Sequence, residues 1–188
     1  MNVHSAEADR LASLGSYHII NTPPEPHFDA LAQEAAHLFA APIALISLVD
    51  ENRNWFKARV GLSVSEAPRP LSFCSHAITS DDLLVVENAA IDARFMHNPL
   101  VKGDPNLRFY AGSVLKNRQG HRLGTICVID VKLRPDVSAR QLSLLEGLSG
   151  AVMKVLEDRR AGIVQHEVQH HRQQNQHYHR QQNQHFHA

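Results

Sequence analysis

Two apolar segments, 107–115 and 123–129, form the most continuous hydrophobic pattern of the chain. They are rich in aromatic and β-branched residues, which favour strands. The turn between them, 116–121, holds Asn117 and Gly120, which tolerate positive φ and therefore suit a hairpin. A strand with one face in water alternates apolar and polar residues, and neither segment does so. The pattern predicts a hairpin in the middle of an antiparallel sheet that is covered on both faces.

Strand alternation assigns the side chains of this hairpin to two opposite faces. In the first strand, one face is expected to carry Leu107, Phe109, Ala111 and Leu115, and the other Tyr110, Gly112 and Val114. In the second strand, one face is expected to carry Leu123, Cys127 and Ile129, and the other Ile126 and Val128. We expect helices on one side of this sheet. The function of the protein then depends on what covers the other side.

Helical periodicity marks three further segments. Residues 7–17 carry Leu11 and Leu14 at helical spacing, and residues 26–39 carry a longer apolar face that begins near Pro26. After a capping-box pattern at 138–141, an apolar stripe recurs at heptad spacing. Its members are Leu142, Leu145, Ser149, Val152 and Leu156. The stripe is suited either to a dimer interface or to packing on the chain's own sheet, and Gly162 is expected to weaken the helix beyond it.

The remaining segments predict a second hairpin, one further short strand, a short helix and a long loop. Residues 41–49 and 55–60 read as strands joined by a polar turn, and 83–86 as another strand. The segment 71–78, LSFCSHAI, is consistent with a short helix that has Ser72 as its N-cap. Residues 88–106 form a long irregular stretch, and loops of this length in a compact domain are often functional.

Composition excludes several classes of protein. The chain has 188 residues, is 43% hydrophobic and has a formal net charge of zero, so we expect neither a nucleic-acid nor a membrane partner. The N-terminus lacks a signal-peptide pattern and no apolar run approaches membrane-spanning length, which favours a cytoplasmic protein. Cys74 and Cys127 are far apart and form no C-x-x-C motif, which argues against a disulfide scaffold or a zinc finger.

The C-terminal stretch has a composition of its own. The eight residues 171–178 are repeated imperfectly at 179–186, and seven of the 14 histidines lie from His166 onward. Without an apolar face, this stretch is expected to be disordered or loosely helical. His166 and His170 are spaced for one helix face and are weak metal candidates, although a low-complexity extension is the favoured interpretation. We therefore divide the chain into 1–24, a central domain at 25–160, and a tail at 161–188.

The order of these elements resembles that of the GAF domain. The stretches 29–62, 71–78 and 108–130 are similar to bacterial sensory GAF domains found with histidine kinases and diguanylate cyclases. The resemblance covers roughly residues 9–156. It implies an α+β fold with an antiparallel sheet of about six strands. It also implies N- and C-terminal helices on one face of the sheet and a small-molecule pocket on the other.

The resemblance also implies which residues contact the ligand, whose identity the sequence does not reveal; a cofactor is likewise unassigned. The candidates lie in the segment that caps the family's pocket, in the long loop and on the central strand: Phe73, Cys74, His76, Phe95, Asn98, Arg108 and Tyr110. Arg108 beside Tyr110 would suit an anionic or planar ligand. For each residue, an ordinary structural role is an equal alternative, and packing is the favoured interpretation of Cys74.

The resemblance leaves three functional hypotheses. The first is a sensory domain that binds a small molecule and forms a homodimer through its terminal helices. It would act either on a partner, with a histidine kinase or diguanylate cyclase as the candidates, or as the input part of a larger protein. The second is a thiol-based reductase of the free methionine sulfoxide type, which would use Cys74 and Cys127 but lacks that family's three-cysteine arrangement. The third is a ligand-free dimerisation scaffold.

The sequence does not mark a site for either of two common chromophores. Bilin attachment in the family requires Cys followed directly by His, whereas here Ser75 separates Cys74 from His76, and no single histidine is marked for haem.

Overall fold

A six-stranded antiparallel sheet forms the centre of the protein, seen here in a computed structural model that describes residues 3–80 and 82–185. The strand order is β3-β2-β1-β6-β5-β4, so the predicted hairpin β5–β6 lies inside the sheet, as expected. The strands are β1 (Ile43–Val49), β2 (Arg53–Val60), β3 (Glu66–Pro68), β4 (Leu83–Val86), β5 (Phe109–Lys116) and β6 (Arg122–Asp130).

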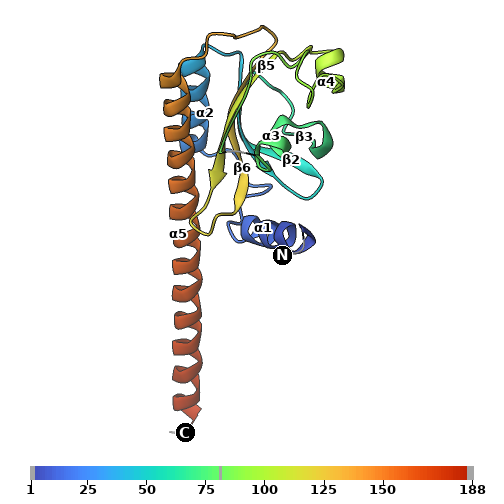
Figure 1. The fold of residues 1–188 in the computed structure, drawn as a ribbon. Helices are drawn as coiled ribbons and strands as arrows, with labels where there is room; N and C mark the ends of the chain where they lie inside the picture. The colour runs from blue at the N-terminus through green and yellow to red at the C-terminus, as the bar shows by residue number, and fades with distance from the viewer. Residues whose placement is uncertain (1–2, 81, 186–188) are drawn as a thin grey trace.

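The helices divide between the two faces and one end of the sheet (Figure 1). Helices α2 and α5 cover one face, the short helix α3 covers the other, and α1 lies across the end of the sheet near the β5–β6 turn. Their bounds are α1 (Val3–Gly15), α2 (Pro26–Phe39), η1 (Arg69–Leu71), α3 (Phe73–Ala77), α4 (Pro99–Lys102) and α5 (Ala139–His185). This α+β arrangement confirms the predicted fold class.

The buried side chains form two hydrophobic clusters, one on each face of the sheet. Strand alternation holds along β5, where Phe109 and Ala111 face α2 and α5 while Tyr110 and Val114 face α3. The prediction was wrong for Leu107, which precedes the strand and packs in the cluster beside α3.

Leu123 also lies on the opposite face from the one predicted. Lys116 pairs with Arg122 and Leu115 with Gly124, so Leu123 is an extra residue in β6. Such a bulge reverses the alternation locally, and Leu123 therefore packs in the cluster beside α2 and α5.

Helix α5 begins with the capping box predicted at Ser138 and Gln141. The Gln141 N–H donates to Ser138 Oγ at 3.1 Å, and the Ser138 N–H donates to Gln141 Oε1 at 3.0 Å. Most of the heptad stripe, with Leu145 and Val152 at its centre, packs on the chain's own sheet. The helix continues without a break past Gly162 to His185, so the tail is a helical continuation of α5 rather than a separate coil.

Candidate functional site

A cavity of about 260 Å³ lies between the sheet and the segments that cover its α3 face. Strands β1, β2, β5 and β6 form its floor, and η1, α3 and the stretch after α4 contribute its walls. The residues that line it are Ile43, Leu45, Phe56, Leu62, Val64, Ala67, Leu71, Ser72, Phe73, Cys74, Leu100, Pro105, Leu107, Tyr110 and Ile129. None of them is charged, so the cavity is an apolar chamber whose lining includes two hydroxyl residues, Ser72 and Tyr110, and one thiol, Cys74.

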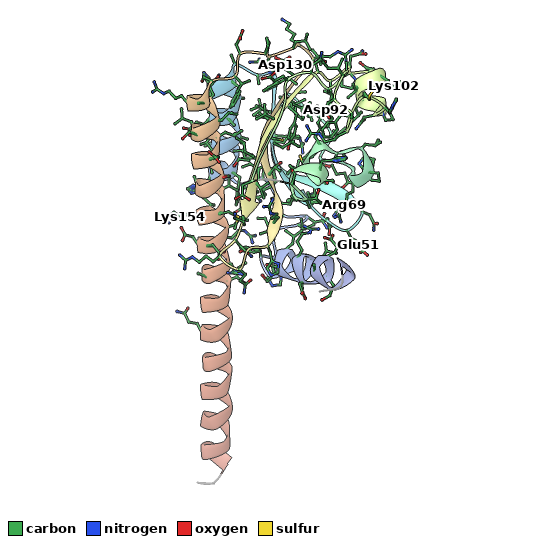
Figure 2. All side chains as sticks on the ribbon, viewed as in Figure 1. Glu51, Arg69, Asp92, Lys102, Asp130 and Lys154 are labelled. Carbon is green, nitrogen blue, oxygen red and sulfur yellow. The ribbon has the colours of Figure 1, made fainter. Side chains whose placement is uncertain are left out.

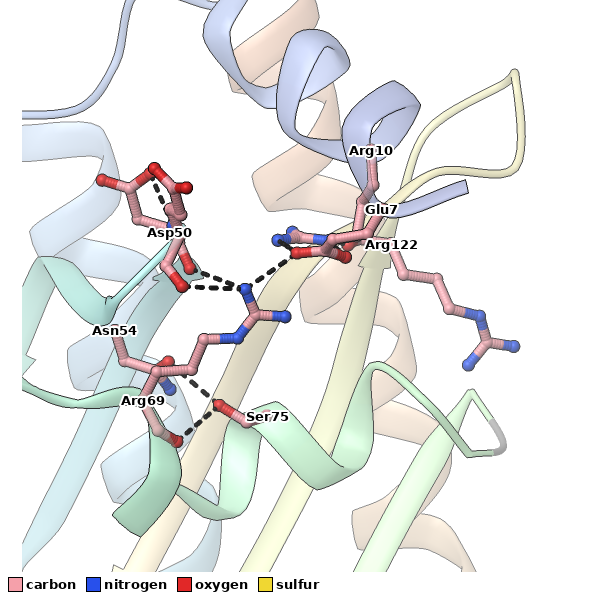
Figure 3. Close-up of polar contacts among 8 residues, drawn as sticks. Glu7, Arg10, Asp50, Asn54, Arg69, Ser75 and Arg122 are labelled. Carbon is pink, nitrogen blue, oxygen red and sulfur yellow. Dashed lines mark hydrogen bonds and ion pairs between the residues drawn. The ribbon is translucent and has the colours of Figure 1, made fainter. Parts of the chain in front are cut away.

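Hydrogen bonds to β2 and within the segment itself fix the cavity wall made by η1 and α3. Ser72 caps α3 by accepting from the Cys74 N–H at 3.1 Å, as predicted, and it also accepts from the Asn54 side chain in β2. Ser75 Oγ donates to Asn54 Oδ1 at 3.2 Å and to the Arg69 carbonyl at 3.0 Å, as Figure 3 shows. The cavity wall is thereby attached to the sheet at β2.

A stack of aromatic rings holds α3 over the long loop. The Phe73 ring stacks on Phe95, with centroids 4.0 Å apart, and on Tyr110, with centroids 5.3 Å apart. Phe95 is fully buried behind Phe73 and does not line the cavity. Phe95 therefore supports the cavity wall, while Phe73 and Tyr110 form part of its surface.

Two thiols and a phenol meet at one wall of the cavity. Cys74 Sγ in α3 lies 3.9 Å from Cys127 Sγ in β6, and the Tyr110 hydroxyl donates to Cys74 Sγ at 3.5 Å. The same hydroxyl lies 3.4 Å from Thr125 Oγ1. Gly112 makes this possible, since a Cβ there would lie 2.2 Å from the Tyr110 hydroxyl oxygen.

The two thiols are electrostatically unequal. Hydrogen bonding with Cys127 lowers the pKa of the Cys74 thiol against the opposing effect of burial, and Thr125 and Tyr110 lower this pKa further. The contact with Cys74, together with burial, raises the pKa of Cys127 well above its usual value. Burial is the main cause that raises the pKa of Tyr110, which therefore stays protonated and able to donate. The hydrogen bond from Tyr110 to Cys74 Sγ therefore favours the thiolate of Cys74.

The other predicted contact residues have structural roles around the cavity. His76 is exposed and meets the Phe95 ring edge-on at 4.8 Å. Asn98 caps α4 and donates to the Leu71 carbonyl at 2.9 Å. Arg108 donates to the carbonyls of Val101 and Leu107 at 2.9 and 3.0 Å. Of the seven predicted residues, Phe73, Cys74 and Tyr110 line the cavity, and the other four hold the segments around it.

Sequence reasoning did not identify the hydroxyl neighbours of the thiol pair. Thr125 contacts Tyr110, and the neighbouring Ser47 is a buried hydroxyl without a hydrogen-bond partner in the described part of the chain. The available signal was strand alternation, since Thr125 lies two residues before Cys127 in β6 and therefore points to the same face.

Neither a metal centre nor a membrane span occurs in the described part of the chain. No three histidine, cysteine or acidic side chains gather there as a metal site would require, and the side chains of His166 and His170 lie outside the described region. No helix within that part combines the length and apolar character needed to cross a bilayer.

This architecture matches a known protein family. The family model for the GAF domain matches residues 23–156, most of the chain. The chain belongs to the GAF domain family. A 147-residue stretch is 37% identical to the cyclic di-GMP phosphodiesterase PA2567 of Pseudomonas aeruginosa, covering 78% of this chain and 25% of that protein. The chain thus spans about a quarter of the length of this curated relative.

Solved GAF structures share the fold at low sequence identity. The GAF domain of an Acinetobacter phosphoenolpyruvate-protein phosphotransferase superposes with a TM-score of 0.60 at 20% identity, over 86% of this chain and 97% of that one. The free methionine-R-sulfoxide reductase of Neisseria meningitidis, solved with its substrate, superposes with a TM-score of 0.57 at 16% identity, over 86% and 96% of the two chains. GAF domains are generally signalling and ligand-binding domains, and the fold also occurs in reductases.

Proposed function

We propose that this GAF domain is a regulatory domain that binds a small apolar molecule in the cavity beneath α3. The observation that carries the proposal is the cavity itself, about 260 Å³ with an uncharged lining. An apolar cavity of about 150 Å³ is already large enough to bind benzene. Backbone carbonyls engage the Arg108 guanidinium, so of the anionic or planar ligands that the sequence suggested, a neutral planar ring suits the chamber better than an anion.

The cavity wall is connected to α1 through Arg69. The Arg69 guanidinium donates to Glu7 Oε1 at 2.8 Å and to the carbonyls of Asp50 and Glu51 at 3.0 and 3.2 Å (Figure 3). Glu7 is also held by Arg10 at 2.8 Å. Figure 2 shows Arg69 and Glu51 at the end of the sheet next to α1, away from Asp130 at the opposite end. A displacement of η1 and α3 would therefore also displace α1.

The residues that follow α1 are in turn attached to α5. The Tyr17 hydroxyl donates to Glu157 Oε1 at 2.5 Å, and Arg159 donates to the carbonyls of Tyr17 and His18 at 3.2 and 3.1 Å. Arg160 contacts Ser16 at 3.3 Å. These contacts complete a continuous route from the cavity wall to α5. Ligand binding that favours one position of α3 would shift the population of α5 arrangements.

The signal leaves through α5 in this proposal. A homodimer formed along α5 would bring two copies of the helix together, and Leu144 supplies an exposed apolar side chain on it. The output would belong to a histidine kinase or diguanylate cyclase, or to a cyclic di-GMP phosphodiesterase as in the relative from Pseudomonas aeruginosa.

Indole titration tests the binding proposal. We expect indole to shift backbone amide NMR signals of residues around Phe73 and Tyr110, and Ala67→Leu to weaken the binding because it fills the cavity. The matched control is Ala30→Leu on the exposed side of α2, which should bind like the wild type. Indole shifts that spare α3 and survive Ala67→Leu would contradict the proposal, as would no binding of indole or of smaller apolar probes such as benzene.

A thiol reductase is the second candidate function. The thiol pair, 3.9 Å apart, favours it, because reduction of a sulfoxide to a sulfide needs two thiols that end as a disulfide, with release of water. Turnover of free methionine sulfoxide with a dithiol reductant, lost in Cys74→Ser, would support the enzyme. A dimer that neither turns over sulfoxide nor binds apolar probes would instead favour the scaffold.

A further inference from the structure

We propose that Cys74 and Cys127 form a dithiol site that hydrogen peroxide oxidises to a disulfide in the wall of the cavity. The pair joins two elements that are distant in sequence, α3 and β6, with the sulfur atoms 3.9 Å apart. Both thiols are free and buried. The chain has two cysteines, and the fold brings both of them into contact. Packing alone could have been achieved there by any small apolar side chains.

The two sulfur atoms differ in access to the oxidant. Cys74 lines the cavity and is 4% exposed, whereas Cys127 is 0% exposed and lies behind it. Hydrogen peroxide is little larger than water and fits a chamber of about 260 Å³. It therefore reaches Cys74 first, which makes Cys74 the attacking thiol and Cys127 the resolving thiol.

The surroundings of Cys74 favour its thiolate, the form that reacts with peroxide. The Tyr110 hydroxyl donates to Cys74 Sγ at 3.5 Å, and the lowered pKa of Cys74 agrees with this geometry. Tyr110 remains a donor because burial raises its own pKa. Thr125 lies 3.4 Å from the same phenol and holds it in place.

The oxidation takes place in two balanced steps. The Cys74 thiolate attacks one peroxide oxygen, an S–O bond forms, the O–O bond breaks, and the departing hydroxide takes a proton to become water. The sulfur of Cys127 then attacks Cys74 sulfenic acid, an S–S bond forms, and the S–O bond breaks. The hydroxide lost from Cys74 leaves as water with the Cys127 proton. Two thiols and one peroxide yield one disulfide and two waters.

Disulfide formation changes the cavity. An S–S bond is much shorter than the present contact between the thiols, so its formation draws α3 toward β6. Because α3 carries Phe73 and Cys74, this movement narrows the chamber. This part of the inference rests on the proposed binding function and predicts weaker ligand binding by the oxidised protein.

Peptide mapping after peroxide treatment of the full chain tests the site. We expect hydrogen peroxide to yield a Cys74–Cys127 cross-linked peptide that a dithiol reductant cleaves. Cys127→Ser should stop at a sulfenic acid on Cys74, trapped by dimedone, and Cys74→Ser should leave Cys127 unreacted. Tyr110→Phe keeps the ring and should slow sulfenic acid formation by about tenfold. Absence of the cross-linked peptide, or trapping of sulfenic acid on Cys127 in the wild type, would overturn the proposal.

Two measurements separate this site from the binding proposal. Circular dichroism recorded while the cross-link forms should keep the signal of the reduced protein, as expected for oxidation in the folded chain. Loss of this signal before cross-linking would contradict the site. Indole binding is then compared between the two forms, with at least tenfold weaker binding expected after oxidation. Unchanged indole affinity would refute the narrowing of the cavity. Absence of indole binding to the reduced form would refute the binding proposal alone, because peptide mapping still tests the dithiol.

Discussion

The two faces of the sheet differ in how completely their side chains fill the interior. On the face covered by α2 and α5, the buried cluster is continuous and dominated by aliphatic and aromatic side chains such as Phe28, Phe39 and Leu148. On the face covered by α3, the cluster surrounds a cavity and contains two thiols and a buried phenol. Close packing is the usual state of protein interiors, and the cavity side departs from it. The densely packed cluster and the proposed binding site thus lie on opposite faces of one sheet.

Truncation of the filled face should give the largest effect. Leu145 in α5 is 0% exposed, and Leu145→Ala is expected to lower the free energy of unfolding by about 2–5 kcal/mol, because it removes buried methyl groups and leaves a void. Leu133, which lies before α5, is 54% exposed, and Leu133→Ala is expected to change stability by no more than about 0.5 kcal/mol. Urea unfolding of both variants measures the difference. Equal losses would contradict the assignment of Leu145 to the core.

Replacing an alanine with leucine adds side-chain volume instead of removing it, and this change should also distinguish the two faces. Ala32 in α2 is fully buried in the filled cluster, so Ala32→Leu is expected to cost about 1–3 kcal/mol through overpacking. Ala67 lines the cavity, so Ala67→Leu has space and is expected to change stability by less than about 1 kcal/mol. Thermal unfolding of the two variants provides the comparison. A cost at Ala67 as large as that at Ala32 would mean that the cavity wall does not tolerate added volume.

The elements of both faces could be predicted from the sequence because their signals are local. Apolar runs without alternation indicated covered strands, and the box at Ser138 and Gln141 indicated the start of α5. Leu123 was misplaced because a bulge depends on the register between two strands, which side-chain alternation in one strand does not reveal.

The site was less predictable because its contacts are not local. Cys74 and Cys127 meet across 53 positions of sequence, and only the packing of α3 on β6 brings them together. Arg108 is close to Tyr110 in sequence, but the carbonyls of Val101 and Leu107 bind its guanidinium, and these are positioned by the fold of the loop. Residue type therefore identified the candidates, while their roles depended on the loop geometry.

Removing one hydroxyl from the cavity side should affect stability only slightly. Tyr110→Phe retains the ring that stacks on Phe73 and loses two long contacts, to Cys74 Sγ at 3.5 Å and to Thr125 Oγ1 at 3.4 Å. We expect a loss of about 0.5–1.5 kcal/mol in the free energy of unfolding, measured in urea. A loss as large as that of Leu145→Ala would indicate that the polar group, rather than apolar packing, holds this face together.

Acid titration should give the smallest effect, at the connection between the cavity wall and α1. Hydrogen bonding from Arg10, and then from Arg69, lowers the pKa of Glu7 from 4.5 to about 2. Because the folded-state pKa is below the unfolded value, the stabilisation is complete above about pH 4.5 and is lost as the pH falls toward 2. Glu7 is partly exposed, so we expect less than about 1 kcal/mol after solvent screening.

The measurement is the free energy of unfolding of the wild type and Glu7→Gln between pH 7 and pH 2, with amide exchange in α1 as a local readout. The difference between the two proteins should be present at pH 7 and shrink below pH 4.5. Glu87→Gln, an exposed control that keeps Glu7, should match the wild type in α1 protection at every pH. A constant difference would mean that Glu7 acts through shape rather than charge. A pH-dependent difference confined to α1, with α2 unaffected, would show that acid loosens the cavity-side connection while the filled face remains intact.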